Sequence, residues 1–450
     1  ADSQEAKDFI KLAFELSEKF DTPVFLRTTT RVSHSKSVVR IEEPVNADDR
    51  TEIRHLPLKY VMVPMNARAR RVEVEKRTQA IREWAETFEG NRMEMGSPEV
   101  GIITAGMPYN YAKDSFPEYS YLKLGLVHPL PEKMIREFAS KVKKLYVVEE
   151  LDPFIEEQVK AMGIEVTGKA VFPYTSEFDP GVVEMAITGK SSSPSVTLQT
   201  IPPRPPNLCP GCPHRGLFYA LNKTKAFVSG DIGCYTLSYM KPLSGMDSCI
   251  CMGASIGIAH GMSKALGPKG KGKVVGVIGD STFIHSGITT LLNTAYNRSD
   301  AVFIIADNRT TAMTGMQEHP ATGFTLQGEK TKELDFAALG KVLGIDSVEV
   351  IDPLNFKDTT RVLKQELQKE GPSLIISRAP CVLLMSKKAV RAKPFFTDPD
   401  KCIGCKVCLS CGCPAISWRD FEKTGMPARP DRKKQKGIAV IDATLCTGCT

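Results

Sequence analysis

Cysteine is missing from the first part of the chain, since all 13 cysteines lie at or after Cys209. Secreted disulfide scaffolds are short and spread their cysteines along the chain, so this distribution argues against such a scaffold and indicates reduced thiols. The chain also lacks a run of about eighteen apolar residues, so no transmembrane helix is expected. Residues 1–20 show an amphipathic helical pattern instead of the apolar block of a signal peptide, and we expect a cytoplasmic protein.

A strong excess of charge is also absent. The formal net charge is +7 over 450 residues, and the basic stretches 268–273 and 429–436 are interpreted as solvated loops. Aromatic residues are not interleaved with these charges, which argues against nucleic-acid binding. The chain has no initial methionine and stops within a cysteine pattern, so we expect it to be part of a longer polypeptide.

Alternating strand and helix patterns predict an α/β protein with parallel sheets. Apolar segments predict buried strands within 22–34 and at 99–106 and 143–151. Residues 46–89 are charged and helical in pattern, which indicates a connecting or covering helix. The stretch 191–207 is rich in proline and serine, cannot bury a core and is predicted to be a linker.

The most informative α/β unit has buried strands predicted at 274–278 and 301–306, joined by a helix at 284–297. A crossover of this size joins parallel neighbours, so Asp280 and Asn308 should meet at the carboxyl edge of one sheet, where such proteins bind ligands. Two oxygen donors there suit Mg²⁺, which usually shares its coordination with phosphate groups. A diphosphate is the expected ligand, and a plain strand and loop without cofactor is the alternative.

Four further cysteines form a close pair followed by two distant single residues. They are Cys209, Cys212, Cys234 and Cys381. Buried thiols, a four-sulfur zinc site and an iron–sulfur cluster are all open interpretations. Cys249 and Cys251 lack such a pattern and are predicted to pack at the head of an apolar helix. The adjoining turn at Gly253 and Ala254 has room for close approach of a cofactor.

The end of the chain is dense in cysteine, and its spacing resembles the ferredoxin run Cys-x2-Cys-x2-Cys-x3-Cys-Pro. Cys402, Cys405 and Cys408 fit the first three positions, which indicates one cluster. The cysteine before Pro414 is one residue late, and a second cluster would use Cys413, Cys446 and Cys449. Each set is one ligand short, Cys411 is extra, and zinc is the rival interpretation.

The segment around Asp280 resembles the magnesium motif of thiamine-diphosphate enzymes, usually Gly-Asp-Gly followed by Asn-Asn. The resemblance implies that Asp280 and Asn308 ligate Mg²⁺ through their side chains and Thr310 through its carbonyl. Ser281 replaces a glycine of the common form, and Asp307 replaces its first asparagine. The expected cofactor contacts are Asp280, Ser281, Asn308, Thr310, Gly233, Gly253 and Ala254.

With the sequence Cys-Pro-Gly-Cys-Pro-His-Arg at 209–215 and the fused ferredoxin run, nearly the whole chain resembles the large, thiamine-binding subunit of indolepyruvate ferredoxin oxidoreductases. The resemblance implies oxidative decarboxylation of an aryl 2-oxoacid with coenzyme A and transfer of electrons to external ferredoxin. It implies thiamine diphosphate, Mg²⁺, two [4Fe–4S] clusters in the ferredoxin segment and a third at Cys209, Cys212, Cys234 and Cys381. It also implies a smaller second subunit, in a heterodimer or heterotetramer.

The implied fold is α/β, with several doubly wound parallel-sheet domains of the thiamine-enzyme type and a small ferredoxin-like iron–sulfur domain. The expected order is the end of a pyrimidine-binding domain (1–45), a charged helical connector (46–97), a transketolase C-terminal-like domain (98–190), a linker (191–207), a thiamine-diphosphate-binding domain (208–390) and an incomplete ferredoxin-like domain (396–450).

The catalytic residue expected of a thiamine enzyme is a glutamate, and by the resemblance it should precede Ala1. His214, His285 and His319 should lie near the site, where each is either a contact or a packed or surface residue. Two other functions stay open: a non-redox thiamine-dependent 2-oxoacid decarboxylase, which leaves the cysteines unexplained, and an electron-transfer iron–sulfur module, which needs no diphosphate site.

Overall fold

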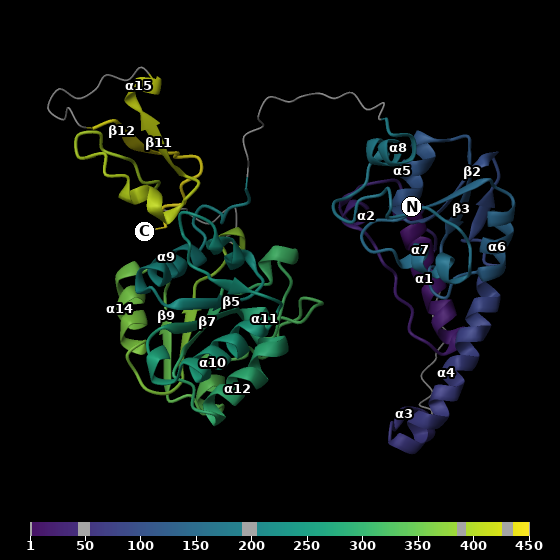
Figure 1. The fold of residues 1–450 in the computed structure, drawn as a ribbon. Coiled ribbons are helices and arrows are strands. Elements are labelled where there is room, and N and C mark those ends of the chain that lie inside the picture. Colours follow the sequence, from purple (N-terminus) through teal and green to yellow (C-terminus); the bar gives the residue numbers. More distant parts are fainter. Residues whose placement is uncertain (1, 44–54, 191–204, 385–392, 425–434, 450) are drawn as a thin grey trace. The chain divides into compact units, whose positions relative to one another are not determined.

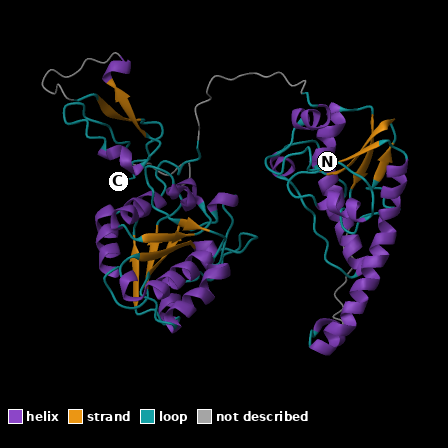
Figure 2. Ribbon diagram, viewed as in Figure 1, coloured by secondary structure: helices purple, strands orange, loops and turns teal. Residues whose placement is uncertain are grey.

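The computed structural model describes residues 2–43, 55–190, 205–384, 393–424 and 435–449. The chain divides into two compact units, residues 1–200 and 201–450, and each is considered by itself (Figures 1 and 2). Most of the predicted linker at 191–207 lies outside the described residues. In the parts of the chain described, no helix combines the length and the apolar character needed to cross a membrane.

The first unit contains a four-stranded sheet in the order β1-β3-β2-β4, in which β2 runs parallel to β3 and β4, and β1 is antiparallel. Its elements are α1 (Ser3–Phe20), α2 (Thr30–His34), α3 (Pro57–Tyr60), α4 (Pro64–Ala85), β1 (Arg92–Glu94), β2 (Ser97–Ala105), α5 (Met107–Ser115), β3 (Tyr119–Leu124), α6 (Glu132–Ser140), β4 (Lys144–Val148), α7 (Phe154–Ala161) and α8 (Pro180–Thr188). The strands predicted at 99–106 and 143–151 and the amphipathic first helix are therefore confirmed.

The charged helix predicted within 46–89 is also present, as α4. It contacts α1 through aromatic side chains, with the ring centroids of Phe20 and Trp84 6.1 Å apart. Helix α1 begins at a cap, since the side chain of Asp2 accepts a hydrogen bond from the backbone N–H of Glu5.

The buried strand predicted within 22–34 is wrong. Residues 22–29 form no strand, α2 follows, and the Phe25 side chain is 94% exposed. The apolar run is only three residues long, Val24 to Leu26, and comes directly after a proline. An isolated extended segment gains too little from burial and hydrogen bonding to be stable alone.

The second unit is built on a six-stranded, wholly parallel sheet in the order β6-β5-β7-β8-β10-β9. Its elements up to residue 384 are α9 (His214–Thr224), β5 (Phe227–Gly230), η1 (Cys234–Tyr239), β6 (Ser248–Cys249), α10 (Ala254–Leu266), η2 (Gly267–Gly270), β7 (Val274–Gly279), α11 (Asp280–Thr282), the π-helical η3 (Phe283–Gly287), α12 (Ile288–Tyr296), β8 (Val302–Asp307), η4 (Ala312–Thr314), α13 (Phe336–Val342), β9 (Ser347–Ile351), α14 (Phe356–Glu366), β10 (Ser373–Arg378) and η5 (Val382–Leu384).

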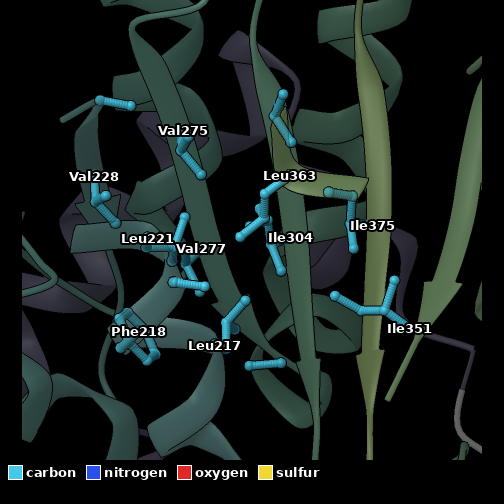
Figure 3. Packing of buried hydrophobic residues seen from close by; sticks show 14 of the residues in the cluster. Leu217, Phe218, Leu221, Val228, Val275, Val277, Ile304, Ile351, Leu363 and Ile375 are labelled. Atoms are coloured by element: carbon cyan, nitrogen blue, oxygen red, sulfur yellow. The ribbon is translucent and has the colours of Figure 1, made fainter. Parts of the chain in front are cut away.

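Helices cover both faces of this sheet, as the doubly wound arrangement predicts. Alternate residues of the buried strands point to opposite faces, so Val275 and Val277 pack with α9 and α14, while Val274 and Ile278 pack with α10, α12 and α13. Figure 3 shows the first of these two clusters. The helix expected at 284–297 begins earlier, because α11 and η3 continue into α12 without a break.

The end of the second unit is a small two-stranded antiparallel sheet. Its elements are η6 (Val407–Cys411), β11 (Ile416–Asp420), α15 (Phe421–Thr424) and β12 (Gly437–Ile441). The ferredoxin-like character of this segment stays a prediction.

Candidate functional site

The carboxyl edge of the large sheet brings the predicted magnesium ligands together. Strands β7 and β8 are parallel neighbours with Gly279 paired to Ala306, so Asp280 and Asn308 follow the ends of adjacent strands. Both side chains are buried, although each is polar. A buried polar group needs a partner, and the contacts of these two residues therefore indicate what the site can hold.

Asp280 has one carboxylate oxygen satisfied and one not. Its Oδ1 accepts a hydrogen bond from the N–H of Ser281 at 2.8 Å. Its Oδ2 lies 3.2 Å from Nε2 of His319, but the two groups are not aligned for a hydrogen bond, and both atoms lack a hydrogen-bond partner among the described residues. A buried carboxylate oxygen without a donor is costly, and a cation bound there would remove that cost.

Asn308 is oriented by the atoms on either side of its amide. Its Oδ1 accepts from the N–H of Thr310 at 3.2 Å, and its Nδ2 lies 3.2 Å from Nε2 of His214. Burial lowers the pKa of His214 to about 4, so the ring is neutral near pH 7 and Nε2 can accept from the amide. The amide oxygen is thereby kept on the side away from His214, where a metal ion can use its remaining lone pair.

The other predicted cofactor contacts are distributed around this edge. Thr310 is buried, and its carbonyl accepts from the N–H of Ala312 at 3.0 Å. Gly253 precedes α10 with φ +91°, and a Cβ there would collide with the side chain of Ser286. Gly233 and Ala254 lie at the starts of η1 and α10, on the loops that follow β5 and β6. Because the Ser286 side chain fills that space, the close approach of a cofactor expected at Gly253 stays a prediction.

Asp231 is a site residue that the sequence analysis missed. Its fully buried carboxylate accepts from the N–H groups of Gly253, at 2.9 Å, and Ser255, at 3.2 Å, at the start of α10. It therefore fixes the turn beside Gly253. The signal was available, because β5 ends at Gly230 with Asp231 next, just as β7 ends at Gly279 with Asp280 next.

Asp307, which replaces an asparagine of the common motif, belongs to a separate ion pair. Its buried Oδ2 accepts from Nε of Arg378 at 2.6 Å, and Nη1 of Arg309 lies 4.0 Å away. Burial raises the pKa of Asp307, Arg378 offsets part of that effect, and the neighbouring Asp280 adds to it. Asp307 is therefore compensated by arginine, whereas Asp280 is not.

Of the three predicted histidines, two contact the magnesium candidates. His214 contacts Asn308, and buried His319 lies against Asp280. His285 is exposed on the π-helical turn, which favours its interpretation as a surface residue.

The four cysteines Cys209, Cys212, Cys234 and Cys381 lie near one another. Burial raises the pKa of Cys212 to about 12, and Cys209 and Cys234 contribute to the rise. Burial also raises the pKa of Cys234, with contributions from Cys381 and Cys209. Cys212 accepts a hydrogen bond from the backbone N–H of His214, and such bonds to sulfur are one way in which proteins tune iron–sulfur clusters.

This cysteine group adjoins the magnesium candidates. The backbone N–H of Cys381 donates to the carbonyl of Asn308 at 2.9 Å, and His214 contacts Cys212 through its backbone and Asn308 through its ring. Within the described residues, no three His, Cys, Asp or Glu side chains converge as ligands of a single metal ion. A cluster on the four cysteines therefore stays a prediction.

Several cysteines near the end of the chain lie close to one another, and their division into two ligand sets stays a prediction. Cys408 lies near Cys402, Cys405 and Cys411, each of which raises its pKa, although burial is the larger cause. Cys413 lies near both Cys411 and Cys449, and it accepts from the N–H of Ala415. Cys446 accepts from the N–H of Phe395 at 3.4 Å. Both sets thus offer soft donors, and in both a backbone N–H is directed at a sulfur.

The predicted packing role of the remaining two cysteines is half right. Cys249 is partly buried and packs against the core on the α9 face of the sheet. Cys251 is exposed, so its predicted packing role is wrong. It precedes the turn into α10, whereas the apolar face of that helix begins only at Ile256.

Comparison with known proteins places these observations in a family. The profile described as "Thiamine pyrophosphate enzyme, C-terminal TPP binding domain" matches residues 231–377. The indolepyruvate oxidoreductase subunit IorA of Archaeoglobus fulgidus is 39% identical over 474 residues, which cover 99% of this chain and 73% of that protein. The protein of the same name from Methanothermobacter thermautotrophicus is 36% identical over 478 residues, covering 100% of this chain and 74% of its own length.

Among solved structures, the 2-oxoglutarate:ferredoxin oxidoreductase from Magnetococcus marinus aligns with a TM-score of 0.36 and 18% identity, over 42% of this chain and 69% of that one. A likeness of this size carries no argument about the present chain.

Proposed function

The chain belongs to the family of indolepyruvate oxidoreductase subunits IorA, and we propose that it serves the oxidative decarboxylation of aryl 2-oxoacids of the indolepyruvate type. It is a thiamine-diphosphate-dependent 2-oxoacid oxidoreductase subunit with a thiamine-diphosphate-binding domain at 231–377. Coenzyme A would take the acyl group, CO₂ would leave, and two electrons would pass to external ferredoxin. These acceptors and the aryl preference are part of the proposal.

The proposed magnesium site consists of the side chains of Asp280 and Asn308 and the carbonyl of Thr310. The buried Oδ2 of Asp280, for which no described residue donates a hydrogen bond, supports this assignment. Bound there, Mg²⁺ would offset part of the negative charge of the diphosphate and of Asp280. Ser281, Gly233, Gly253 and Ala254 are the further proposed cofactor contacts.

The residues of this chain position the cofactor, and the chemistry is the cofactor's own. Thiamine diphosphate supplies an electron sink for the carbanion formed on loss of CO₂. His214 keeps the amide of Asn308 oriented, Asp231 holds the turn before α10, and His319 lies against the ligand Asp280. The proton-transferring glutamate of thiamine enzymes is proposed to lie outside this sequence.

One observation favours the redox reaction over a non-redox thiamine decarboxylase. The group containing Cys212 and Cys381 is joined to Asn308 through His214 and through the Cys381 backbone. We propose that Cys209, Cys212, Cys234 and Cys381 hold a [4Fe–4S] cluster beside the thiamine site. Two more clusters are proposed in the ferredoxin-like segment, one on Cys402, Cys405 and Cys408 and one on Cys413, Cys446 and Cys449, each with a further ligand.

The domain assignments given above are likewise proposals, as are the ferredoxin-like character of 396–450 and a smaller partner subunit. An electron-transfer module alone would not need the diphosphate edge around Asp280, and the thiamine-binding domain argues against that alternative.

The proposal is tested on the complete subunit with its partner, purified without oxygen. Iron, acid-labile sulfide, zinc and thiamine diphosphate are quantified, and indolepyruvate with coenzyme A is added while the cluster absorbance is followed. About twelve irons per chain, for three four-iron clusters, together with bleaching that requires the 2-oxoacid, is the expected result. Zinc in place of iron, or thiamine without bleaching, would overturn the redox assignment.

A further inference from the structure

The side chain of Arg215 joins two cysteine segments that are far apart in the sequence. Arg215 lies in the first turn of α9 and is 8% exposed. Its Nη1 donates to the carbonyl of Cys411 at 2.9 Å, and its Nη2 donates to the carbonyl of Leu208 at 2.6 Å, with a longer contact of 3.4 Å to that of Cys209. One guanidinium group is therefore held by carbonyl groups from both the Cys209 loop and the ferredoxin-like segment.

Other contacts bring the same two segments together. Gly211, between Cys209 and Cys212, has φ +75°, and a Cβ there would collide with the side chain of Thr447, between Cys446 and Cys449. The hydroxyl groups of Ser410 and Tyr219 lie 3.2 Å apart. The Cys-Pro-Gly-Cys loop therefore faces the Cys-Thr-Gly-Cys loop. The Thr447 side chain lies directly against the backbone of Gly211, where any side chain would collide with it.

Arg215 also places positive charge between the two sets of thiols. Its charge lowers the pKa of Cys212 and of Cys413, although burial is the larger influence on both and raises them. Its Nε is buried and has no hydrogen-bond partner in the described part of the chain. A charged N–H in that position is costly if it stays unmatched, and a cluster sulfur is an acceptor that would match it.

We propose that Arg215 is a positioning residue for electron transfer, which docks the ferredoxin-like segment so that its Cys413, Cys446 and Cys449 side faces the Cys209–Cys212 loop. This inference rests on the proposed function. In each transfer one electron leaves the cluster on the Cys209 set, which is oxidised, and enters the cluster on the Cys413 set, which is reduced. The two hydrogen-bonding arms of the guanidinium group fix the separation between the two cysteine segments. Its positive charge stabilises the reduced form of a cluster, which is the more negative one.

The test compares Arg215→Gln and Arg215→Lys with the wild type and with the control Arg361→Gln, whose side chain is exposed on α14. All are prepared as complete subunit with its partner. Hydrogen exchange of residues 405–420 reports docking without any turnover. Redox titration followed by electron paramagnetic resonance reports the cluster potentials.

We expect Arg215→Gln to speed exchange in 405–420 at least tenfold and to leave α12 unchanged, which shows that the domain is folded. The cluster potentials should fall, and a tenfold shift in the reduction equilibrium is about 59 mV for a one-electron couple. Arg215→Lys should also loosen docking, because lysine lacks the two-armed hydrogen bonding of the guanidinium group, but the cluster potentials should fall less, because lysine keeps the positive charge.

Exchange and potentials that match those of Arg361→Gln would overturn the inference about Arg215 and leave the proposed function standing. A fall in the potentials of the Cys402, Cys405 and Cys408 cluster alone would overturn the proposed facing side. Wild-type protein without iron would overturn the proposed function as well, whereas exchange would still decide whether Arg215 docks the segment.

Discussion

The ion pair between Asp307 and Arg378 allows a direct test of the charge balance at the sheet edge. The Asp307 side chain is fully buried, and Nε of Arg378 is 2.6 Å from its Oδ2. Arg378→Met removes the charge and keeps most of the aliphatic volume. Among the described residues, Asp307 would then keep the hydrogen bond from the backbone N–H of Arg309 to its Oδ1, at 3.2 Å, and the distant Nη1 of the same residue, at 4.0 Å.

The expected loss of folding stability depends on whether the unpaired Asp307 carboxyl group stays charged or takes up a proton. Leaving one member of a buried ion pair costs about 3–5 kcal/mol if the charge stays. If the carboxyl protonates instead, the cost at pH 7 is limited to about 4 kcal/mol, because each unit between pH 7 and the unfolded pKa of about 3.9 costs about 1.36 kcal/mol. The loss at pH 7 should therefore approach, and not exceed, about 4 kcal/mol.

The loss should depend on pH in a defined direction. Burial already raises the folded pKa of Asp307, and removal of Arg378 raises it further. A group with a raised folded pKa binds more protons in the folded state, so stability falls as pH rises from the unfolded pKa towards the folded one. The limit is about 1.5 kcal/mol at pH 5 by the same conversion, well below the limit at pH 7.

Native-state hydrogen exchange of β8 and β10 measures this loss locally, which suits a multi-domain chain that does not unfold in one step. At pH 7 exchange should accelerate up to roughly a thousandfold in Arg378→Met, and at pH 5 only about tenfold. Arg361→Met, at an exposed pair, should change little. The reasoning is refuted if Arg378→Met behaves like Arg361→Met, or if adding Asp307→Asn fails to restore most of the stability.

Three further predictions concern the cofactor edge. His214→Phe removes the acceptor for the Asn308 amide and should weaken binding of Mg²⁺ with thiamine diphosphate about 10–100-fold by calorimetry, while His214→Gln loses less; equal losses would contradict this. Gly253→Ala should lower the melting temperature, because φ at this position is +91° and the new Cβ would collide with Ser286. Adding Ser286→Gly to this variant should restore only part of the lost melting temperature, and full restoration would show that the backbone is unstrained. Removal of Mg²⁺ by a chelator should release thiamine diphosphate, and added Mn²⁺ should restore its binding in the wild type but not in Asp280→Asn. The thiamine diphosphate that remains bound after desalting measures this.

The sequence was sufficient to predict the arrangement of two strands where both are continuous apolar runs and one helix joins them. The segments 274–278 and 301–306 had to be parallel neighbours, which placed Asp280 and Asn308 at one edge. The same approach failed for residues 22–34. An apolar run does not reveal whether another strand lies beside it, and Phe25 is exposed because none does in the described structure.

The long-range partners of the candidate site residues could not be read from the sequence. His319, Arg378 and Arg215 each meet their partners across long sequence separations, and a single charged residue carries no periodic signal. Asp231 is different, because a Gly-Asp at the end of a buried strand repeats the pattern that identified Asp280. It was missed because its carboxylate caps a turn and is not in the motif itself.

The arrangement also explains why this chain departs from the common thiamine motif at position 307. An asparagine there would be neutral, whereas Asp307 brings a second carboxylate next to Asp280 and would compete for the same cation. Arg378 reduces that competition by pairing with the buried Asp307 carboxylate, while Arg309 lies 4.0 Å from Asp307 and pairs with Glu333 at 2.7 Å. The Asp307 charge is thus met chiefly by Arg378, and the Oδ2 of Asp280, which has no hydrogen-bond partner among the described residues, is left as the proposed position for a divalent cation. Asp307 and Arg378 together therefore take the place of the one neutral asparagine of the common motif. Changing either residue alone should lower the folding stability more than changing both.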